Sequence, residues 1–244
     1  MRRHLSLAIL LVPLHGALAQ GTADDGACRD LPQLSDAAPL AVGTITGTER
    51  THFVKDAIER KSCPDASLEC RARAYLVSGD RVLIGARRGS YLCATYLAPG
   101  DRKRTDTGRS GWLPAAAVTV APAAAVAPEG WLGTWTRVEA TIRVKPGARP
   151  GTLAVTGDAT WGSLDPDRVR RGAVNLGSLE GTVTPSGDAL SFAMGEKGTL
   201  PVGQGDAADC KVWMRRLGPW LVVDDNNACG GMNVSFRGLY SRAP

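Results

Sequence analysis

The sequence predicts an all-β fold made of two small antiparallel domains that are cross-linked by disulfides. Three observations lead to this prediction. Short runs of alternating apolar and polar residues are separated by turn residues such as Gly, Pro, Asn and Asp. An uncharged segment of Ala, Val, Thr and Pro occupies residues 115–128 and divides the chain in two. All six Cys follow an export-type leader, which favours disulfides.

Residues 1–19 have the composition of a secretory signal peptide. Arg2 and Arg3 supply a positive start, Leu5–Leu14 a short apolar run, and Ala17-Leu18-Ala19 a cleavage site. The run is too short to span a bilayer, and no later run reaches spanning length. We therefore expect cleavage near Ala19 and a periplasmic or secreted protein of 225 residues.

The charge of the remaining chain is nearly balanced. Without Arg2 and Arg3 it has 27 basic and 24 acidic residues, a formal charge of +3 that both halves share. A nucleic-acid binder would usually concentrate its basic residues on one face beside stacking aromatic side chains. We therefore expect a solvated mixed surface, no nucleic-acid partner and no membrane span; the composition leaves the oligomeric state open.

The six Cys allow 15 pairings, and a domain boundary near residue 121 reduces them. Four Cys precede the boundary and two follow it, which predicts a Cys210–Cys229 disulfide. Among the first four we favour a local Cys63–Cys70 bridge together with Cys28–Cys93, with the other pairings open. Zinc is the alternative, but no Cys-x-x-Cys is present, so we expect neither a metal nor another cofactor.

The first half predicts an extended lead-in over 20–49, a domain over 50–120 and a linker over 121–128. The expected strands of this domain are Thr51–Val54, Arg73–Val77, Val82–Ile84, Tyr91–Leu97 and Gly111–Leu113.

Three short motifs of this domain resemble the SH3-like barrels of exported bacterial proteins. They are Gly79-Asp80-x-Val82 at a tight turn, the aromatic strand around Cys93, and Gly108-x-x-Gly111-Trp112-Leu113-Pro114 near the end. The segment 63–70 and the basic loop 101–109 depart from that pattern. The resemblance implies a domain that binds a cell-wall or protein ligand. Its aromatic groove would be formed by Tyr75, Tyr91, Tyr96 and Trp112; core packing is the alternative role for each, and for Trp112 we favour it.

Residues 129–244 predict a second domain of seven or eight short strands that closes into an antiparallel barrel. Alternation runs from Trp135 to Val144 with one apolar face. The later strands are expected at Thr152–Trp161, Ser178–Thr184, Ala189–Met194, Cys210–Leu217, Trp220–Asp224 and Asn233–Tyr240.

The start of this domain, Gly133-Thr134-Trp135, resembles the Gly-x-Trp of lipocalin- and avidin-like barrels. The resemblance implies that Trp135 closes one end of the barrel against a basic residue near the last strand, either Arg237 or Arg242, through a cation–π contact. The domain is short for a lipocalin, and a barrel of this size usually fills its interior with side chains.

Residues that could carry catalysis are few. Once His4 and His15 leave with the leader, His52 is the last His, and each Cys has an expected disulfide partner. Asp224 and Asp225 could form a calcium site or a catalytic pair, but no calcium-loop spacing surrounds them, so we favour a turn. The sequence thus predicts a protein that is not an enzyme.

The predicted function is a non-catalytic periplasmic binding protein whose SH3-like domain engages a cell-envelope component or a protein partner. Two alternatives concern the second domain. It could carry an apolar small molecule inside the barrel, using Trp161 or Trp213. It could instead inhibit a lysozyme-type enzyme through a protruding loop over Trp161–Arg171, which includes Arg170.

Overall fold

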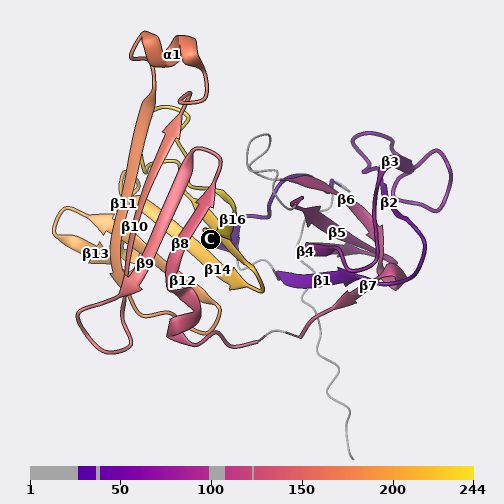
Figure 1. Ribbon diagram of the computed structural model, residues 1–244, viewed down its shortest axis with the longest axis horizontal. Coiled ribbons are helices and arrows are strands. Elements are labelled where there is room, and N and C mark those ends of the chain that lie inside the picture. The colour runs from indigo at the N-terminus through magenta and orange to yellow at the C-terminus, as the bar shows by residue number, and fades with distance from the viewer. Residues whose placement is uncertain (1–26, 37–38, 99–107, 123) are drawn as a thin grey trace, which may run out of the picture.

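The computed structural model describes residues 27–36, 39–98, 108–122 and 124–244, and it confirms the all-β prediction. Two antiparallel sheets lie side by side, one from each half of the chain (Figure 1). The predicted leader and the cleavage site near Ala19 lie outside the described residues. Within the described part of the chain, no helix is long and apolar enough to cross a membrane.

The first sheet, here called the N-terminal sheet, has seven strands in the order β3-β2-β6-β5-β4-β1-β7. Its strands are β1 (Ala41–Ile45), β2 (Thr51–Val54), β3 (Arg71–Leu76), β4 (Arg81–Arg88), β5 (Tyr91–Tyr96), β6 (Arg109–Pro114) and β7 (Val118–Val120). Three-residue 3-10 turns occur at η1 (Leu34–Asp36) and η2 (Ala115–Ala117).

Strand β1 falls in the segment for which the sequence predicted only an extended lead-in. It pairs with β4 and β7, so residues 41–45 belong to the sheet. Gly43 makes residues 41–45 less typical of a strand in the sequence. A larger residue would not fit there, because a Cβ at this position would lie 2.6 Å from Val118 Cγ1. The close approach of β7 therefore explains both the residue and the missed strand.

Two buried clusters hold the N-terminal sheet together. The larger one consists of nine buried residues, with Phe53, Leu76 and Leu113 among the largest. The smaller one surrounds Trp112, which is 2% exposed and packs with Cys28, Cys63 and Cys70. Trp112 is therefore a core residue, as favoured from the sequence.

The second sheet, here called the C-terminal barrel, has nine strands in the order β11-β10-β9-β8-β16-β15-β14-β12-β13. They are β8 (Gly133–Arg137), β9 (Ala140–Pro146), β10 (Leu153–Trp161), β11 (Asn175–Val183), β12 (Ala189–Gly195), β13 (Gly198–Leu200), β14 (Cys210–Leu217), β15 (Trp220–Asp225) and β16 (Gly238–Arg242). The remaining elements are η3 (Pro128–Trp131), α1 (Pro166–Arg170) and η4 (Val202–Gln204). The Thr182 amide donates to Thr199 Oγ1 at 2.8 Å, so β11 approaches β13 and the sheet nearly closes.

The expected alternation over Trp135–Val144 is interrupted by a hairpin turn. Glu139 has a positive φ of 55°, and Trp135 on β8 pairs with Ile142 on β9. The turn lacks the Gly or Asn that usually marks such a bend. It is supported instead by the Glu139 carboxylate, which accepts hydrogen bonds from the Ser163 amide (2.6 Å) and hydroxyl (2.9 Å).

The last strand begins later than the expected Asn233. The backbone amide of Phe236 donates to the Asp225 carboxylate at 2.5 Å, and the Ser235 hydroxyl donates to it at 3.0 Å. Asn233 itself has a positive φ of 67°. The segment before Gly238 therefore bonds to a side chain instead of a neighbouring strand, and β16 starts where this loop ends.

Twenty buried residues fill the interior of the C-terminal barrel. Among the largest are Trp131, Trp135, Phe192, Phe236 and Tyr240, each at most 1% exposed. Glycines accommodate some of the rings. At Gly181 a Cβ would lie 2.6 Å from the Phe192 ring, so this glycine leaves the space that the phenyl group occupies.

A third cluster forms a seam between the two sheets. Leu34 and Leu83 from the first half pack there with Trp220, Val222 and Leu239 from the second half. All six residues of β15 are buried, because one face lines the barrel interior and the other faces the N-terminal sheet.

Residues 28–36, here called the strap, cross this seam. The Leu34 amide donates to Asp224 Oδ2 at 2.8 Å, and the Arg237 guanidinium donates to the Leu31 carbonyl. Arg237 Nη1 also lies 2.6 Å from Asp224 Oδ1 in an ion pair, and the Asp224 side chain is 5% exposed. The strap therefore joins the two halves through both apolar packing and a partly buried ion pair.

Candidate binding site

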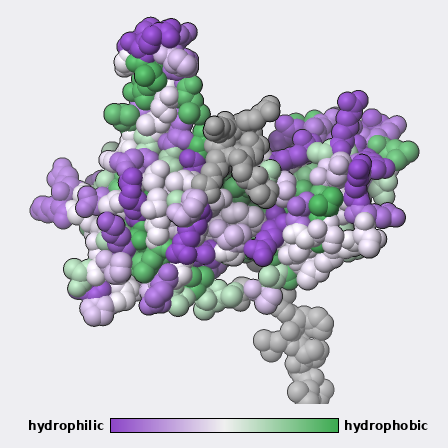
Figure 2. All heavy atoms as spheres, in the orientation of Figure 1, coloured by the Kyte–Doolittle hydropathy of each residue, from purple (hydrophilic) through white to green (hydrophobic). Residues whose placement is uncertain are grey.

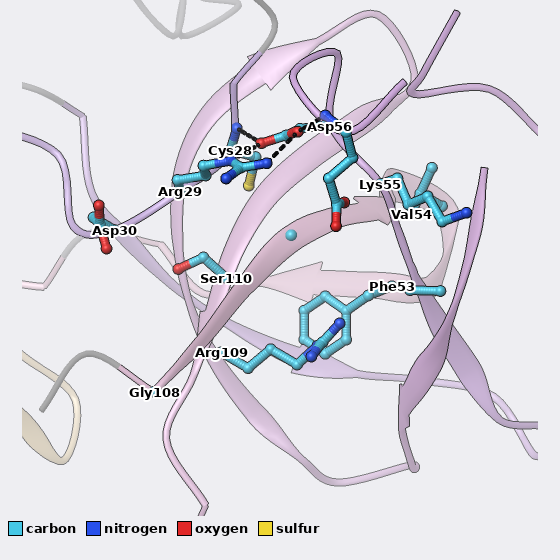
Figure 3. A pocket seen from close by; sticks show the side chains of 13 residues that line it. Cys28, Arg29, Asp30, Phe53, Val54, Lys55, Asp56, Gly108, Arg109 and Ser110 are labelled. Carbon is cyan, nitrogen blue, oxygen red and sulfur yellow. Dashed lines mark hydrogen bonds and ion pairs between the residues drawn. The ribbon is translucent and has the colours of Figure 1, made fainter. Parts of the chain in front are cut away.

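A groove of about 370 Å³ opens in the N-terminal sheet between β2 and β6 (Figure 3). These two strands pair at Val54↔Trp112, and the groove lies beside this narrow junction. Its wall is formed by the strap, β2, the loop after β2 and the start of β6. The lining residues are Cys28, Arg29, Asp30, Phe53, Val54, Lys55, Asp56, Glu59, Ala72, Gly108, Arg109, Ser110 and Gly111.

One wall is an ion pair between the strap and the loop after β2. Arg29 Nε donates to Asp56 Oδ2 at 2.7 Å, and Nη2 donates to Oδ1 at 3.2 Å, so the contact is bidentate. The Cys28–Cys93 disulfide holds the strap against β5 and so fixes the position of Arg29. Figure 3 shows the guanidinium and the carboxylate facing each other across the upper edge of the groove.

The Asp56 carboxylate is buried and also organises its own loop. It accepts hydrogen bonds from the backbone amides of Ile58 (3.1 Å), Glu59 (2.9 Å) and Cys28 (3.4 Å). The hydrogen bond from Arg29 outweighs the effect of burial and, with the amides, lowers the pKa of Asp56 from 3.8 to about 2. Asp56 therefore remains a carboxylate throughout the physiological range.

The floor and the opposite wall combine an aromatic ring with further charges. The Arg109 guanidinium lies 5.6 Å from the centroid of the buried Phe53 ring. A Cβ at Gly111 would lie 2.9 Å from that ring, so this glycine leaves room for it. Lys55 donates to the Glu69 carbonyl at 2.8 Å.

The groove thus presents three cationic and three acidic side chains beside the buried Phe53 ring. The cations are Arg29, Lys55 and Arg109, and the acids are Asp30, Asp56 and Glu59. This arrangement can recognise a polar ligand by charge. The hydroxyl of Ser110, also in the lining, is hydrogen-bonded to Thr95 Oγ1 at 2.9 Å.

His52 is engaged in contacts on β2. Its Nδ1 lies 2.9 Å from the Ala72 carbonyl, and its Nε2 lies 2.6 Å from Arg71 Nη2. Arginine only donates, so Nε2 accepts and Nδ1 carries the proton that is donated to Ala72. The described residues contain no group of three His, Cys, Asp or Glu side chains that could hold a metal ion.

The four aromatic residues expected to form one groove do not converge. Tyr75 is 42% exposed on β3, where Arg50 lies 4.4 Å from its ring centroid. Tyr91 packs against the Trp112 cluster, whereas Tyr96 packs against the larger core. The Tyr96 hydroxyl donates to Asp80 at 3.2 Å; burial, followed by the Asp80 charge, raises the pKa of Tyr96.

Trp161 and Arg170 both belong to the projection that β10, α1 and β11 form on the C-terminal barrel. The Arg168 guanidinium stacks 4.0 Å from the Trp161 ring centroid, and Arg170 pairs with Asp167. Trp213, considered as a carrier residue, does not join the interior cluster; it packs against the seam.

Trp135 is fully buried in the barrel core, with two arginine side chains near its ring. Arg242 is the last-strand cation, 5.5 Å from the ring centroid, while Arg237 is used at the seam. The sequence did not identify Arg216, which lies closer at 4.6 Å. A Cβ at Gly133, whose φ is 129°, would lie 2.8 Å from Arg242 Nε, so the motif glycine leaves room for this contact.

The disulfides are Cys28–Cys93, Cys63–Cys70 and Cys210–Cys229, the pairing favoured from the sequence. Asp224 and Asp225 each accept hydrogen bonds from a different segment of the chain and do not form one site. Asp224 binds the strap and Arg237, and Asp225 holds the Ser235–Phe236 loop.

Comparison of the chain with models of known protein families, with curated proteins and with solved structures found no match. The SH3-like and lipocalin-like assignments therefore remain predictions. The charged lining of the groove was not predicted. A usable signal was the Asp56-x-x-Glu59 sequence directly after a strand, since Asp in that position often accepts amides of the following turn.

Proposed function

We propose that the protein is a non-catalytic periplasmic binding protein whose N-terminal half engages a cell-envelope or protein partner. The observation that carries the proposal is the groove between β2 and β6, with its six charged side chains. The three disulfides support an oxidising compartment outside the cytosol.

The chemistry of the groove favours a short peptide that carries both carboxylate and ammonium groups. Arg109 and Lys55 offer donors to a carboxylate, and Glu59 and Asp30 offer acceptors to an ammonium group. Arg29 and Asp56 neutralise each other and form a fixed wall. The peptide portions of cell-wall fragments have this combination of charges, and so do many protein segments.

The filled barrel interior favours this proposal over a small-molecule carrier. Ligand cavities of carriers are lined by apolar side chains that leave space for the ligand. Here Phe192, Phe236 and Met214 occupy the interior of the barrel.

Thermal unfolding of the mature protein with purified cell-wall peptide fragments tests the proposal. A ligand at a hundredfold excess over its Kd stabilises the folded state by about 2.7 kcal/mol, so the transition of the N-terminal half should shift upward. Arg109→Glu should abolish the shift. Arg81→Glu, an exposed position on β4 outside the groove lining, is the matched control and should keep it.

Two results would contradict the proposal. One is the absence of a shift with cell-wall fragments and with a panel of short zwitterionic peptides. The other is a shift that survives Arg109→Glu, which would place the ligand elsewhere on the protein.

A further inference from the structure

The start of β6 directs backbone groups into the groove. β6 pairs with β5 from Tyr91↔Pro114 to Tyr96↔Arg109. In an antiparallel pair, every second residue directs its amide and carbonyl toward the partner strand, and the residues between them direct these groups to the other side. One hydrogen bond sets this alternation for β6, because the Ala115 amide donates to the Ser90 carbonyl at 2.8 Å directly after the last pair.

The alternation places the backbone of Ser110 on the groove side. Counting back from Ala115, residues 113, 111 and 109 bond to β5, and Pro114, Trp112 and Ser110 direct their backbone groups toward β2. The side chains agree with this count. Thr95 Oγ1 and Ser110 Oγ lie 2.9 Å apart, and opposed side chains are closest in the pairs whose backbones do not bond to each other. Ser110 therefore presents its amide and its carbonyl to the groove, whose lining includes it.

Strand β2 pairs with Trp112 alone. Pro114 has no N–H, so the pairing does not extend in that direction. In the other direction β2 ends at the residue opposite Trp112, and Asp56 would be opposite Ser110. The Asp56 carbonyl instead accepts the Arg60 amide at 3.0 Å as the chain turns away. Among the described residues, the backbone amide and carbonyl of Ser110 therefore have no partner, and its hydrogen bond is made by the hydroxyl.

The carboxylate across the groove does not bond to Ser110 either. Asp56 accepts hydrogen bonds from Arg29 and from three backbone amides of the strap and of its own loop. Figure 3 shows Ser110 on β6 between this ion pair and Arg109. Ser110 is half-buried. A half-buried amide and carbonyl without partners favour a ligand that bonds to both.

The groups that complement Ser110 are those of another extended chain. A peptide that adds to the edge of a strand gains affinity from main-chain hydrogen bonds. The volume of about 370 Å³ lies near the small end of ligand sites, which measure about 300–1,000 Å³, and suits a short peptide. In the view of Figure 2, hydrophilic side chains predominate over β2, β3 and β6, so this part of the surface offers no broad apolar area to a folded partner.

We propose that an extended peptide pairs with Ser110 through its main chain. One peptide residue donates its amide to the Ser110 carbonyl and accepts from the Ser110 amide. Arg109, whose guanidinium lies over Phe53 in the same recess, binds the carboxylate of the peptide. This inference rests on the function proposed for the groove and specifies how the peptide is recognised. Because the main chain supplies the contacts, the site tolerates different peptide side chains.

Tri-alanine is the probe, because only its central residue has both an amide N–H and an amide carbonyl. Calorimetry with the full mature protein should show saturable one-to-one binding. Tri-alanine N-methylated at the central residue keeps both terminal charges but lacks the donor, so it should bind roughly tenfold more weakly. The matched control is tri-alanine N-methylated at the third residue. That amide points away from Ser110 in an extended chain, so the control should bind as tri-alanine does.

Hydrogen exchange of the isotope-labelled protein, followed by NMR, measures the contact directly. The Ser110 amide should exchange rapidly in the free protein, because it has no partner. When nine-tenths of the sites are occupied by tri-alanine, this amide should exchange about tenfold more slowly, because only the free fraction exchanges. The Gly111 amide, which bonds to β5, is the internal control and should be protected with and without the peptide.

The outcomes separate this inference from the function on which it rests. The inference is overturned if tri-alanine does not bind, if the two methylated peptides bind equally, or if the Ser110 amide exchanges as fast in the complex as in the free protein. In each of these cases the proposed function stands if cell-wall fragments still raise the unfolding midpoint and Arg109→Glu abolishes that shift.

Discussion

The two halves of the protein reach stability by different means. The C-terminal barrel buries a single cluster of twenty residues and has one disulfide. The N-terminal sheet has clusters of nine and five buried residues and two disulfides, which themselves form part of the smaller cluster. Small cores supply little stabilisation by burial alone, so cross-links contribute a larger share. The comparison shows where each half is vulnerable: the barrel to cavities, the sheet to reduction.

The surfaces available for binding differ in the same way. The N-terminal sheet has a polar recess because its strands diverge beside Val54↔Trp112, where the strap adds charge. The C-terminal barrel is filled, so its distinctive surface is a projection with exposed apolar side chains. The two halves therefore present different kinds of surface, a charged recess in the first and an exposed apolar projection in the second.

The largest expected effect is a cavity in the barrel. Trp135→Ala removes a fully buried ring that contacts Arg216 and Arg242, so we expect a loss of about 3–5 kcal/mol in the free energy of unfolding. Chemical denaturation followed by tryptophan fluorescence measures it. Trp161→Ala, at the half-buried end of β10, is the control and should cost much less. Equal losses would show that the barrel core does not dominate its stability.

Loss of the Cys28–Cys93 disulfide should lower the free energy of unfolding of the N-terminal sheet by nearly as much. Cys28 and Cys93 are 65 residues apart, so their cross-link restricts the unfolded chain by about 4 kcal/mol, against about 2 kcal/mol for the seven-residue Cys63–Cys70 loop. Replacing both Cys28 and Cys93 with Ser should therefore destabilise the N-terminal sheet more than the same change at Cys63 and Cys70.

Calorimetry of the two double variants measures this difference. The transition of the C-terminal barrel should move little in either one. A barrel that unfolds together with the sheet in the Cys28 and Cys93 variant would show instead that the seam couples the halves into one cooperative unit.

Local patterns predicted much of this fold. Period-2 alternation located most strands, with Cys210–Leu217 correct at both ends, and the count of Cys on each side of the midpoint led to the Cys210–Cys229 disulfide. The predictions of turns and strands failed where a contact with a distant residue, not a local sequence pattern, determines the backbone. The turn at Glu139 contains neither Gly nor Asn and is supported by the hydrogen bond from the Ser163 amide. Gly43 interrupts the strand pattern of β1, but Val118 on β7 occupies the space that a side chain at this position would need.

The groove and the seam depend on contacts between distant residues. Arg29 and Asp56 are 27 residues apart, and Arg109 reaches the same recess from another strand. Sequence patterns of one segment cannot show that pairing. The seam does have a signal in the sequence. Four consecutive apolar residues at Trp220–Val223 indicate a strand that is buried on both faces, whereas a barrel strand with one face in solvent would alternate apolar and polar residues.

A moderate effect concerns acid stability, which should separate the two halves again. The pKa of Asp56 falls from 3.8 to about 2 on folding, so its stabilisation is complete above pH 4 and disappears as the pH drops from 4 through 2. Its size is about 2 kcal/mol, since Arg29 is half exposed and solvent weakens the pair.

Denaturation of the N-terminal sheet between pH 5 and pH 2 measures this loss. Asp56→Asn should lower stability at pH 5 and should remove most of the acid dependence below it. An unchanged acid dependence in that variant would assign the effect to other carboxylates.

The smallest expected effect is at Tyr96, whose hydroxyl joins β5 to the turn before β4. Tyr96→Phe removes the 3.2 Å hydrogen bond to Asp80, which should cost about 1 kcal/mol in the N-terminal sheet and nothing in the barrel. Ultraviolet titration of the wild type provides a second measurement. Because burial and the Asp80 charge raise the pKa of Tyr96, the ionisation that is lost in the variant should be a late one. If the ionisation that Tyr96→Phe removes coincides with that of the exposed Tyr75, the hydroxyl of Tyr96 is freer of Asp80 than its position between β5 and the turn implies.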